Sequence, residues 1–484
     1  MKSGGQPFLL EPKGDVNLGR SDMGERIRRR FLQALLLSLL LWIGTCSPDR
    51  SAYAEGVQAS ASGQFPDVIL ISLDTTRADH LSLYGYPLST SPNLARFADR
   101  AVVFQKATTV VPLTGPSHAS LFTSLYPHQH GAFRNGIPIR EDMTTLASLL
   151  AQQGYDTAGF VSGWTLKRKI CGLTPGFRVY EEGFTRRYKL FNQERPAEEV
   201  TEAVANFLAS GSYRRPLFLF IHYFDPHDPY RRHAFQWEEL SEEATRLGYD
   251  IEKEVLAYDC ELAYMDFHLG RLLEILGSQG LLGNAVVWIV GDHGESLGEH
   301  DYWGHGRRVY EQTLRVPMVI YAPGKIPDHA EVAEMASTLD ILPTTLGLLG
   351  TSLPPDHRVE GRDLSGCLLT GKPLPAGRHY FETFKGTWRK LTRIIAREVP
   401  DQPSLLGYYE GNIKYILESD SSSPEIYDIS VDNAETDNLA SRMGTDFFDT
   451  ELLTWFQQGR SLQPVTVDLT TEEVKQLKSL GYIN

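Results

Sequence analysis

AVVWIVGDHGE, residues 285–295, decides the fold class of this chain. Its first six residues are apolar and β-prone, the composition of a strand that is covered on both faces of a sheet. The run then breaks abruptly into Gly, Asp and His. DVILISLD at 67–74 and PLFLFIHYFDPH at 216–227 have the same form. The three stretches predict parallel strands whose polar ends can meet at one edge of a sheet.

Segments with helical periodicity lie between these strands, for instance around 143–153, 197–209 and 253–277. Strands that alternate with helices form a largely parallel sheet. We therefore expect an α/β fold that binds ligands at the carboxyl ends of its strands. Turn formation also explains any single Asp or His at such an end, so only their convergence would indicate a site.

The residue composition and pattern change twice along the chain, which predicts three parts. Residues 1–64 read as an N-terminal segment and linker, and residues 65–375 as the α/β domain. Short, aromatic-rich alternating pieces follow, so we expect residues 376–484 to form a small antiparallel sheet subdomain. The last stretch, TEEVKQLKSLGYIN, predicts a terminal amphipathic helix.

Charge and the N-terminus bear on partners and location. The net charge of −14 opposes adhesion to nucleic acid, which we do not expect as a partner. A cluster of arginines at 26–30 precedes the apolar run FLQALLLSLLLWIG at 31–44, the order of an export signal. At 14 residues the run is short for a bilayer span. We therefore expect an exported protein, periplasmic or extracellular.

Two processing routes remain open for this signal. IGTC, which ends at Cys46, resembles a weak lipobox and would make the protein a lipoprotein held to a membrane through its N-terminus alone. AYA at 52–54 is a small-x-small cleavage site and would release it.

Asp292 and His293 stand side by side directly after a predicted strand. A carboxylate beside an imidazole suits a divalent cation of borderline hardness, so zinc or manganese is favoured over calcium or magnesium. Asp74, at the end of another strand, can supply the third ligand. Catalytic metal sites often have three protein ligands and keep a further position open.

Thr114, in VPLTGPSHASLF at 111–122, is the candidate for that open position. A free hydroxyl is a poor nucleophile, but coordination to a metal lowers its pKa as it does for water. Thr114 also stands where a helix begins, and unpaired N–H groups there can bind an oxyanion. Helix capping explains the same residue type, and this alternative stays open.

Four stretches, in order, resemble the signatures of the sulfatase family, which belongs to the alkaline-phosphatase-like superfamily. They are DVILISLDTTRADHLSLYGY (67–86), TGPSHASLFTSLYPHQHG (114–131), FDPHDPY (224–230) and GDHGESLGEHDYWGHGRRVYEQTLRVP (291–317). The resemblance implies an α/β/α sandwich with a mainly parallel central sheet and a small C-terminal antiparallel sheet. It places Asp74, Asp292 and His293 at metal positions.

The departures from the family pattern concern the active centre. Thr114 stands where the family has the cysteine or serine that is oxidised to formylglycine, Thr75 where many members have a second Asp, and His118 where they have Arg. His305 stands where they often have Lys. Threonine cannot become the formylglycine aldehyde, so no formylglycine is expected. A threonyl sulfate lacks the elimination route of that group, which favours phosphoryl chemistry.

The histidines add a second resemblance, to the phosphoethanolamine transferases, which use a threonine nucleophile. It implies that His227 and His305 contact the transferred phosphate or a second metal, and that either can protonate the leaving oxygen. Asn135 matches an asparagine that contacts the substrate oxyanion in some phosphodiester-cleaving relatives. His118 and His222 complete the set of predicted substrate-binding residues.

These observations predict a metal-dependent hydrolase of phosphate or sulfate esters in which Thr114 forms a covalent intermediate. The substrate would be an anionic ester of a small molecule, glycan or lipid. One alternative is a transferase that passes a phospho-group to an envelope glycan or lipid. The other is a family member that binds anionic glycans without turning them over.

Overall fold

The computed structural model describes residues 65–459, with gaps at 141, 185, 189–191, 356, 385–402, 419–423 and 445, together with residues 470, 471 and 475. The predicted export segment and nearly all of the predicted terminal helix lie outside the described residues. Among the helices that are described, none combines the length and apolar character needed to cross a bilayer.

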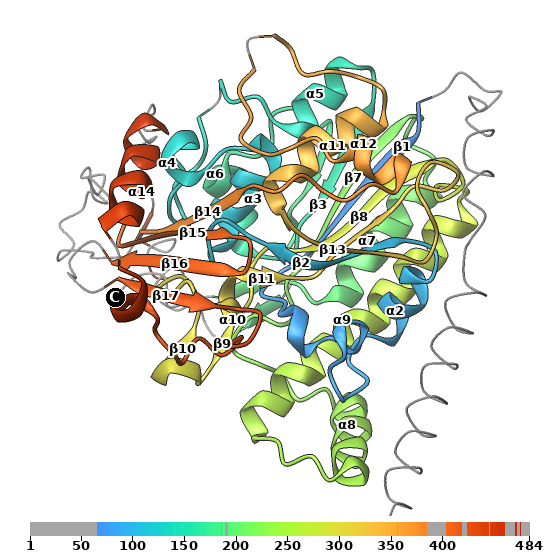
Figure 1. Cartoon of the computed structure of the whole chain (residues 1–484). Helices are drawn as coiled ribbons and strands as arrows, with labels where there is room; N and C mark the ends of the chain where they lie inside the picture. The colour runs from blue at the N-terminus through green and yellow to red at the C-terminus, as the bar shows by residue number, and fades with distance from the viewer. Residues whose placement is uncertain are drawn as a thin grey trace, which may run out of the picture. The chain divides into compact units, whose positions relative to one another are not determined.

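A nine-stranded sheet forms the centre of the α/β part (Figure 1). β1 (Asp67–Leu73) lies in its middle and pairs in parallel with β7 (Leu217–Tyr223) on one side and β8 (Ala285–Gly291) on the other. All three strands are buried along their whole length, as their continuous apolar sequences predict.

The sheet continues on both sides of this trio. Beyond β7 come β3 (Asp156–Phe160) and β4 (Val179–Glu181), both parallel. Beyond β8, β12 (Met318–Tyr321) runs antiparallel to β8 and to β2 (Val102–Thr108). β2 also pairs with β13 (Ala330–Ser337) in parallel and with β11 (Arg315–Val316) antiparallel. The sheet is therefore mainly parallel, as predicted.

Helices cover both faces of the sheet (Figure 1). One face packs against α3 (Thr114–Thr123), α5 (Leu146–Gln152), α11 (Ile341–Leu348) and α12 (Ser365–Thr370). The other packs against α2 (Pro92–Ala98), α7 (Ala197–Ala209) and α9 (Lys253–Ser278). Alternate residues of β1 enter the two cores, so the strand divides the sandwich. The α/β/α arrangement that the resemblance implies is confirmed.

A second, antiparallel sheet follows in the order β14 (Arg378–Thr383), β15 (Leu405–Glu410), β16 (Ile413–Glu418) and β17 (Glu425–Asp428). This confirms the predicted small C-terminal sheet, while the domain boundary at residue 375 stays a prediction. Buried Glu382 on β14 accepts a 2.8 Å hydrogen bond from the backbone N–H of His128. This bond connects the C-terminal sheet to the α/β part.

The remaining elements are short or peripheral. They are α4 (Pro127–His130), α6 (Arg168–Cys171), α8 (Ala234–Leu247), α10 (Glu311–Leu314), α13 (Ala440–Met443), α14 (Asp446–Gly459), β5 (Arg186–Tyr188), β6 (Asn192–Glu194), β9 (Ser296–Leu297) and β10 (Trp303–Gly304).

Candidate active site

The register of the central strands brings two carboxylates together. Leu73 of β1 pairs with Gly291 of β8, so Asp74 and Asp292 leave the sheet side by side. His293 follows at once, and all three side chains are buried. One ligand atom from each of these three residues lies within 4.8 Å of the others. The convergence predicted from the strand ends is therefore present.

The donor atoms of this trio suit a cation. Nδ1 of His293 donates to the carbonyl of Gly294 at 2.9 Å, so Nε2 carries the lone pair. Oδ1 of Asp292 accepts from the backbone N–H of His293 at 2.7 Å. Its Oδ2 is buried and has no hydrogen-bond partner among the described residues. An orphaned carboxylate oxygen beside an imidazole lone pair is the arrangement that a divalent metal fills.

The pKa values of the two buried carboxyl groups also indicate a cation site. Burial raises the pKa of Asp74, but the hydrogen bond from His222 and the neighbouring histidines outweigh it and hold that pKa below its usual value. Burial and the neighbouring charge of Asp74 raise the pKa of Asp292 well above its usual value. Two carboxylates this close cannot both stay ionised in a buried site without a cation.

Thr75 occupies the position where the resembling family often has a carboxylate, and it adopts a left-handed conformation with φ 56°. This conformation is strained for a β-branched residue, at a cost of about 1–3 kcal/mol. Its N–H donates to Oδ1 of Asp292 at 3.0 Å, and its hydroxyl donates to the Asp74 carboxylate. Thr75 therefore orients both carboxylates and adds no charge to the site.

Thr114 begins α3 and is fully buried. Its hydroxyl oxygen lies 3.3 Å from Nε2 of His293. The expected oxyanion site at the helix N-terminus is reduced, because Pro116 has no N–H and the N–H of Gly115 donates to Oδ1 of Asn135 at 2.7 Å. Nδ2 of Asn135 is buried and has no partner within the described part of the chain. That amide is a donor available for a substrate oxygen.

His118 and His222 lie behind these groups. Nδ1 of His118 donates to the carbonyl of Thr114 at 2.7 Å, one helical turn away. Nε2 of His222 donates to Oδ2 of Asp74 at 3.1 Å. Both rings are buried, and burial lowers the pKa of His118 to about 3. Substrate contact by these two histidines stays a prediction, whereas their contacts here orient the nucleophile candidate and a metal ligand.

His227 and His305 form a pair of neighbouring rings next to His293. The ring centroids of His227 and His305 are 5.1 Å apart, and those of His293 and His305 are 4.5 Å apart. Nδ1 of His305 is hydrogen-bonded to Oε1 of buried Glu295 at 3.0 Å. Burial lowers the pKa of His305 to about 3 and raises that of Glu295 to about 8. The structure thus places His305 beside His293, and His227 beside His305.

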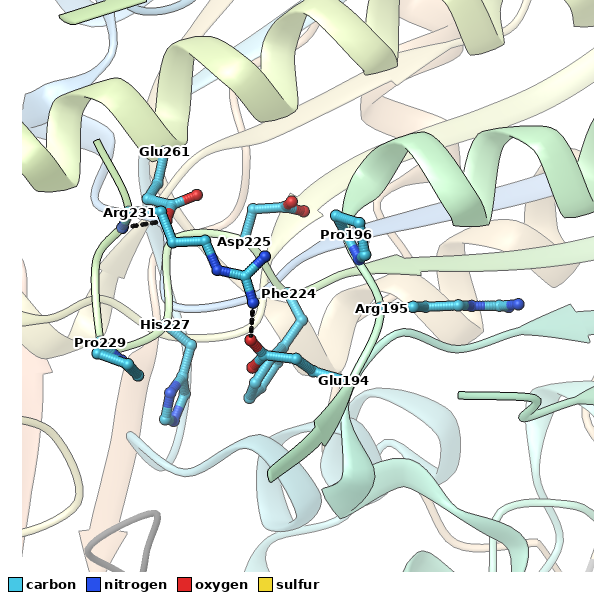
Figure 2. Close-up of a pocket in the computed structure, with 9 residues that line it drawn as sticks. All are labelled: Glu194, Arg195, Pro196, Phe224, Asp225, His227, Pro229, Arg231 and Glu261. Atoms are coloured by element: carbon cyan, nitrogen blue, oxygen red, sulfur yellow. Dashed lines mark hydrogen bonds and ion pairs between the residues drawn. The ribbon is translucent and has the colours of Figure 1, made fainter. Parts of the chain in front are cut away.

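A small polar pocket adjoins His227 (Figure 2). Its lining includes Glu194, Asp225, Arg231 and Glu261. The enclosed space is about 10 Å³, room for roughly one water molecule. The pocket is therefore a packed cluster of charged groups and has no space for the alcohol part of an ester.

Glu295, Thr75 and Glu261 were not predicted as site residues. Glu295 stands in the GDHGE stretch, two residues after His293, and this proximity was the available signal. Thr75 was noted only for the carboxylate that it lacks. Glu261 lies inside a helix far along the chain, where no local pattern marks it.

Fold and site together define an ester hydrolase of the alkaline-phosphatase-like class, with a candidate metal centre at the carboxyl edge of the sheet. The sulfatase family model matches residues 66–351, and the chain belongs to the sulfatase family. A second model, "N-sulphoglucosamine sulphohydrolase, C-terminal", matches residues 298–461.

Known relatives agree with this assignment. The chain is 24% identical to an N-acetylglucosamine-6-O-sulfatase of Bacteroides thetaiotaomicron, over 77% of this chain and 82% of that protein. A structure solved with D-glucosamine-2-N,6-O-disulfate superposes with a TM-score of 0.62 at 20% identity, over 82% of this chain and 97% of that one. The structure of a phosphonate monoester hydrolase from Silicibacter pomeroyi superposes with a TM-score of 0.61 at 21% identity, over 81% of this chain and 94% of that one.

Proposed function

We propose that the protein hydrolyses phosphate or sulfate esters through a covalent intermediate on Thr114, with phosphate esters preferred. The observation that supports this most is the 3.3 Å separation between the Thr114 hydroxyl and Nε2 of His293, beside two carboxylates. A nucleophile must lie this close to the groups that activate it.

Asp74, Asp292 and His293 would hold a divalent metal. When bound, such an ion supplies Lewis acidity, which lowers the pKa of a hydroxyl so that its proton can be lost to water. Zinc or manganese fits the donor set best, because an imidazole nitrogen is present and Thr75 contributes no carboxylate.

The remaining steps use the chain's own residues. The oxygen of Thr114 attacks phosphorus, and the bond from phosphorus to the alcohol oxygen breaks. His227 gives a proton to that leaving oxygen, and its Nε2 is the nitrogen for this role because Nδ1 donates to the carbonyl of Asp228 at 2.7 Å. Asn135 donates to a non-bridging oxygen. Water then attacks phosphorus and the bond to Thr114 breaks. A proton from this water regenerates the Thr114 hydroxyl, and His227 takes up a proton from solvent.

Phosphate and sulfate esters remain two arms of the test. The names of the sulfatase relatives favour a sulfated glycan. The threonine favours phosphorus, because a threonyl phosphate can be opened by in-line attack of water whereas a threonyl sulfate lacks an easy exit. The phosphonate monoester hydrolase among the structural neighbours is in line with this preference.

The decisive experiment combines metal analysis of the purified protein with mass spectrometry of the peptide that carries Thr114, after incubation with an aryl phosphate, a phosphodiester and an aryl sulfate. A phosphorylated peptide supports the proposal, and a sulfated one reverses the substrate preference. Turnover only in the presence of an acceptor alcohol would indicate a transferase. An unmodified peptide without turnover, together with glycan binding, would indicate a binding protein.

We also propose that the protein is exported, on the basis of the arginine cluster and apolar run at 26–44. Fractionation of expressing cells tests this. Labelling with a radioactive fatty acid distinguishes lipid attachment at Cys46 from cleavage after AYA.

A further inference from the structure

The loop at 224–233 carries His227 from the end of β7 to the start of α8. Its first part is fixed to α7, because the carboxylate of Asp225 accepts the N–H of Ala197 at 2.9 and 3.1 Å. Within the loop, the rings of Phe224 and His227 stack with centroids 4.4 Å apart. Because His227 also donates to the backbone carbonyl of Asp228, its imidazole follows the loop backbone.

The last part of the loop is fixed by Glu261, a buried carboxylate on α9. One oxygen of Glu261 accepts the backbone N–H of Arg231. The other is hydrogen-bonded to Nε2 of His233 at 2.8 Å. The guanidinium of Arg231 in turn donates to Glu194 at 2.5 Å (Figure 2). A single side chain of α9 therefore holds two residues of the loop end.

Burying this carboxylate is costly, and burial raises the pKa of Glu261 well above its usual value. The cavity beside Glu261 has a volume of about 10 Å³, which is too small for a ligand larger than a water molecule. Ligand binding at this cavity therefore does not explain why the carboxylate is buried. All hydrogen bonds found for Glu261 within the described chain go to the loop of His227. The arrangement therefore serves to fix that loop.

We propose that Glu261 is a positioning residue, which holds the loop at 224–233 so that His227 meets the oxygen of the leaving alcohol. The proposal rests on the proposed function of His227 as proton donor. A displacement of about 1 Å in a catalytic group can cost about a hundredfold in rate. Loss of the Glu261 contacts should therefore act on the step in which His227 takes part.

The experiment compares two aryl phosphates, 4-nitrophenyl and unsubstituted phenyl, whose leaving oxygens differ in their need for a proton. His227→Gln sets the reference, with a loss of about 10²–10⁴-fold that is concentrated on the phenyl ester. Glu261→Gln keeps one acceptor, and we expect about a tenfold extra loss on the phenyl ester. Glu261→Leu removes both acceptors and should lose more on the same ester.

Asp266→Asn is the matched control. Asp266 is also a buried carboxylate on α9, and its oxygens accept the backbone N–H groups of Asn93 and Leu94, each at 2.8 Å. These contacts hold α2, which carries none of the site residues. The substitution should destabilise the protein to a similar extent, and the ratio of rates on the two esters should stay that of the wild type.

Three outcomes are distinguishable. A leaving-group dependence in the Glu261 variants that follows His227→Gln and is absent from Asp266→Asn supports the proposal. The dependence in His227→Gln alone overturns the role of Glu261 and leaves the proposed function intact. Its absence from His227→Gln overturns the acid role of His227 and the role of Glu261 with it. Thermal unfolding of each variant, measured in parallel, identifies any that fails to fold.

Discussion

The hydroxyl oxygen of Thr114 lies 3.3 Å from Nε2 of His293, although 178 residues separate the two in the chain. Their meeting depends on two elements, because α3 begins at Thr114 and β8 ends directly before Asp292. At this distance the hydroxyl is within reach of the groups that would activate it as a nucleophile.

Thr114→Val keeps the shape of the side chain and removes its hydroxyl, so we expect at least about a thousandfold loss of kcat. Thr114→Ser keeps the hydroxyl and should retain measurable turnover. Thr123→Val, which removes a buried hydroxyl bonded to Ala119 at the other end of α3, is the control and should keep near wild-type activity. Steady-state kinetics on an aryl phosphate decides; equal losses in Thr114→Val and Thr123→Val would argue against a nucleophilic role.

Removal of the metal should destabilise the protein as well as inactivate it. Without a cation, Asp74 and Asp292 face each other in a buried site, and a ligand that binds only the folded state stabilises it by about 2.7 kcal/mol at a hundredfold excess over Kd. We expect chelation to lower Tm, and zinc or manganese to restore it in a concentration-dependent way.

Asp292→Asn provides the control for this metal prediction. The variant should contain little metal by elemental analysis and should respond neither to chelator nor to added ion. A chelator effect of equal size in Asp292→Asn would mean that the stabilising ion binds elsewhere.

The sequence was informative where local pattern determines structure. The apolar runs predicted β1, β7 and β8, and the expected helices at 197–209 and 253–277 correspond to α7 and α9. The convergence of Asp74 with Asp292 followed from the rule that parallel strands end at one edge.

Local sequence patterns could not predict the contacts that depend on strand register and on the rotation of helices. Oγ of Ser72 on β1 is hydrogen-bonded to Nε2 of His118 at 2.8 Å, and Ser72 pairs with His222 on β7. No single segment determines this register. The left-handed backbone of Thr75, which a β-branched residue disfavours, accompanies its hydrogen bonds to Asp292 and Asp74. The contact of Glu261 with the loop at 224–233 likewise depends on how α9 packs in the folded chain.

Gly115 and Asn135 make contact so close that an added methyl group would disrupt it. A Cβ at position 115 would lie 2.8 Å from Oδ1 of Asn135. Gly115→Ala should therefore displace the Asn135 amide and lower kcat/KM by about 10²-fold, similar to Asn135→Ala, because one donor to a developing charge contributes about that much. Steady-state kinetics of both single variants and of the double variant measures the effect.

The double variant is the critical comparison for Gly115. If Gly115 acts through Asn135, the losses should not add in Gly115→Ala/Asn135→Ala. Gly366→Ala, at a position with open space around it, is the control and should leave kcat/KM unchanged. Fully additive losses would show that the methyl group acts on something other than the amide.

A buried contact between α10 and the C-terminal sheet should make stability depend on pH. Glu435 is buried, accepts the N–H of Glu311 at 2.6 Å and pairs with Lys414 at 2.7 Å. Burial raises its pKa to about 7, against the effect of Lys414, whereas the unfolded chain has the ordinary value of 4.5. Between these values the folded state keeps a proton that the unfolded state releases, so this contribution is complete below pH 4.5 and is lost as pH rises through about 7.

The free energy of unfolding should accordingly fall by on the order of 2–3 kcal/mol between about pH 4.5 and 7 on account of Glu435. Glu435→Gln cannot titrate, so its urea-unfolding free energy should vary less with pH in this window than that of the wild type. Glu331→Gln, at an exposed position, should preserve the wild-type slope. If Glu435→Gln preserved the slope too, the pH dependence would have to come from other carboxyl groups, and not from the buried contact of Glu435 with Glu311 and Lys414.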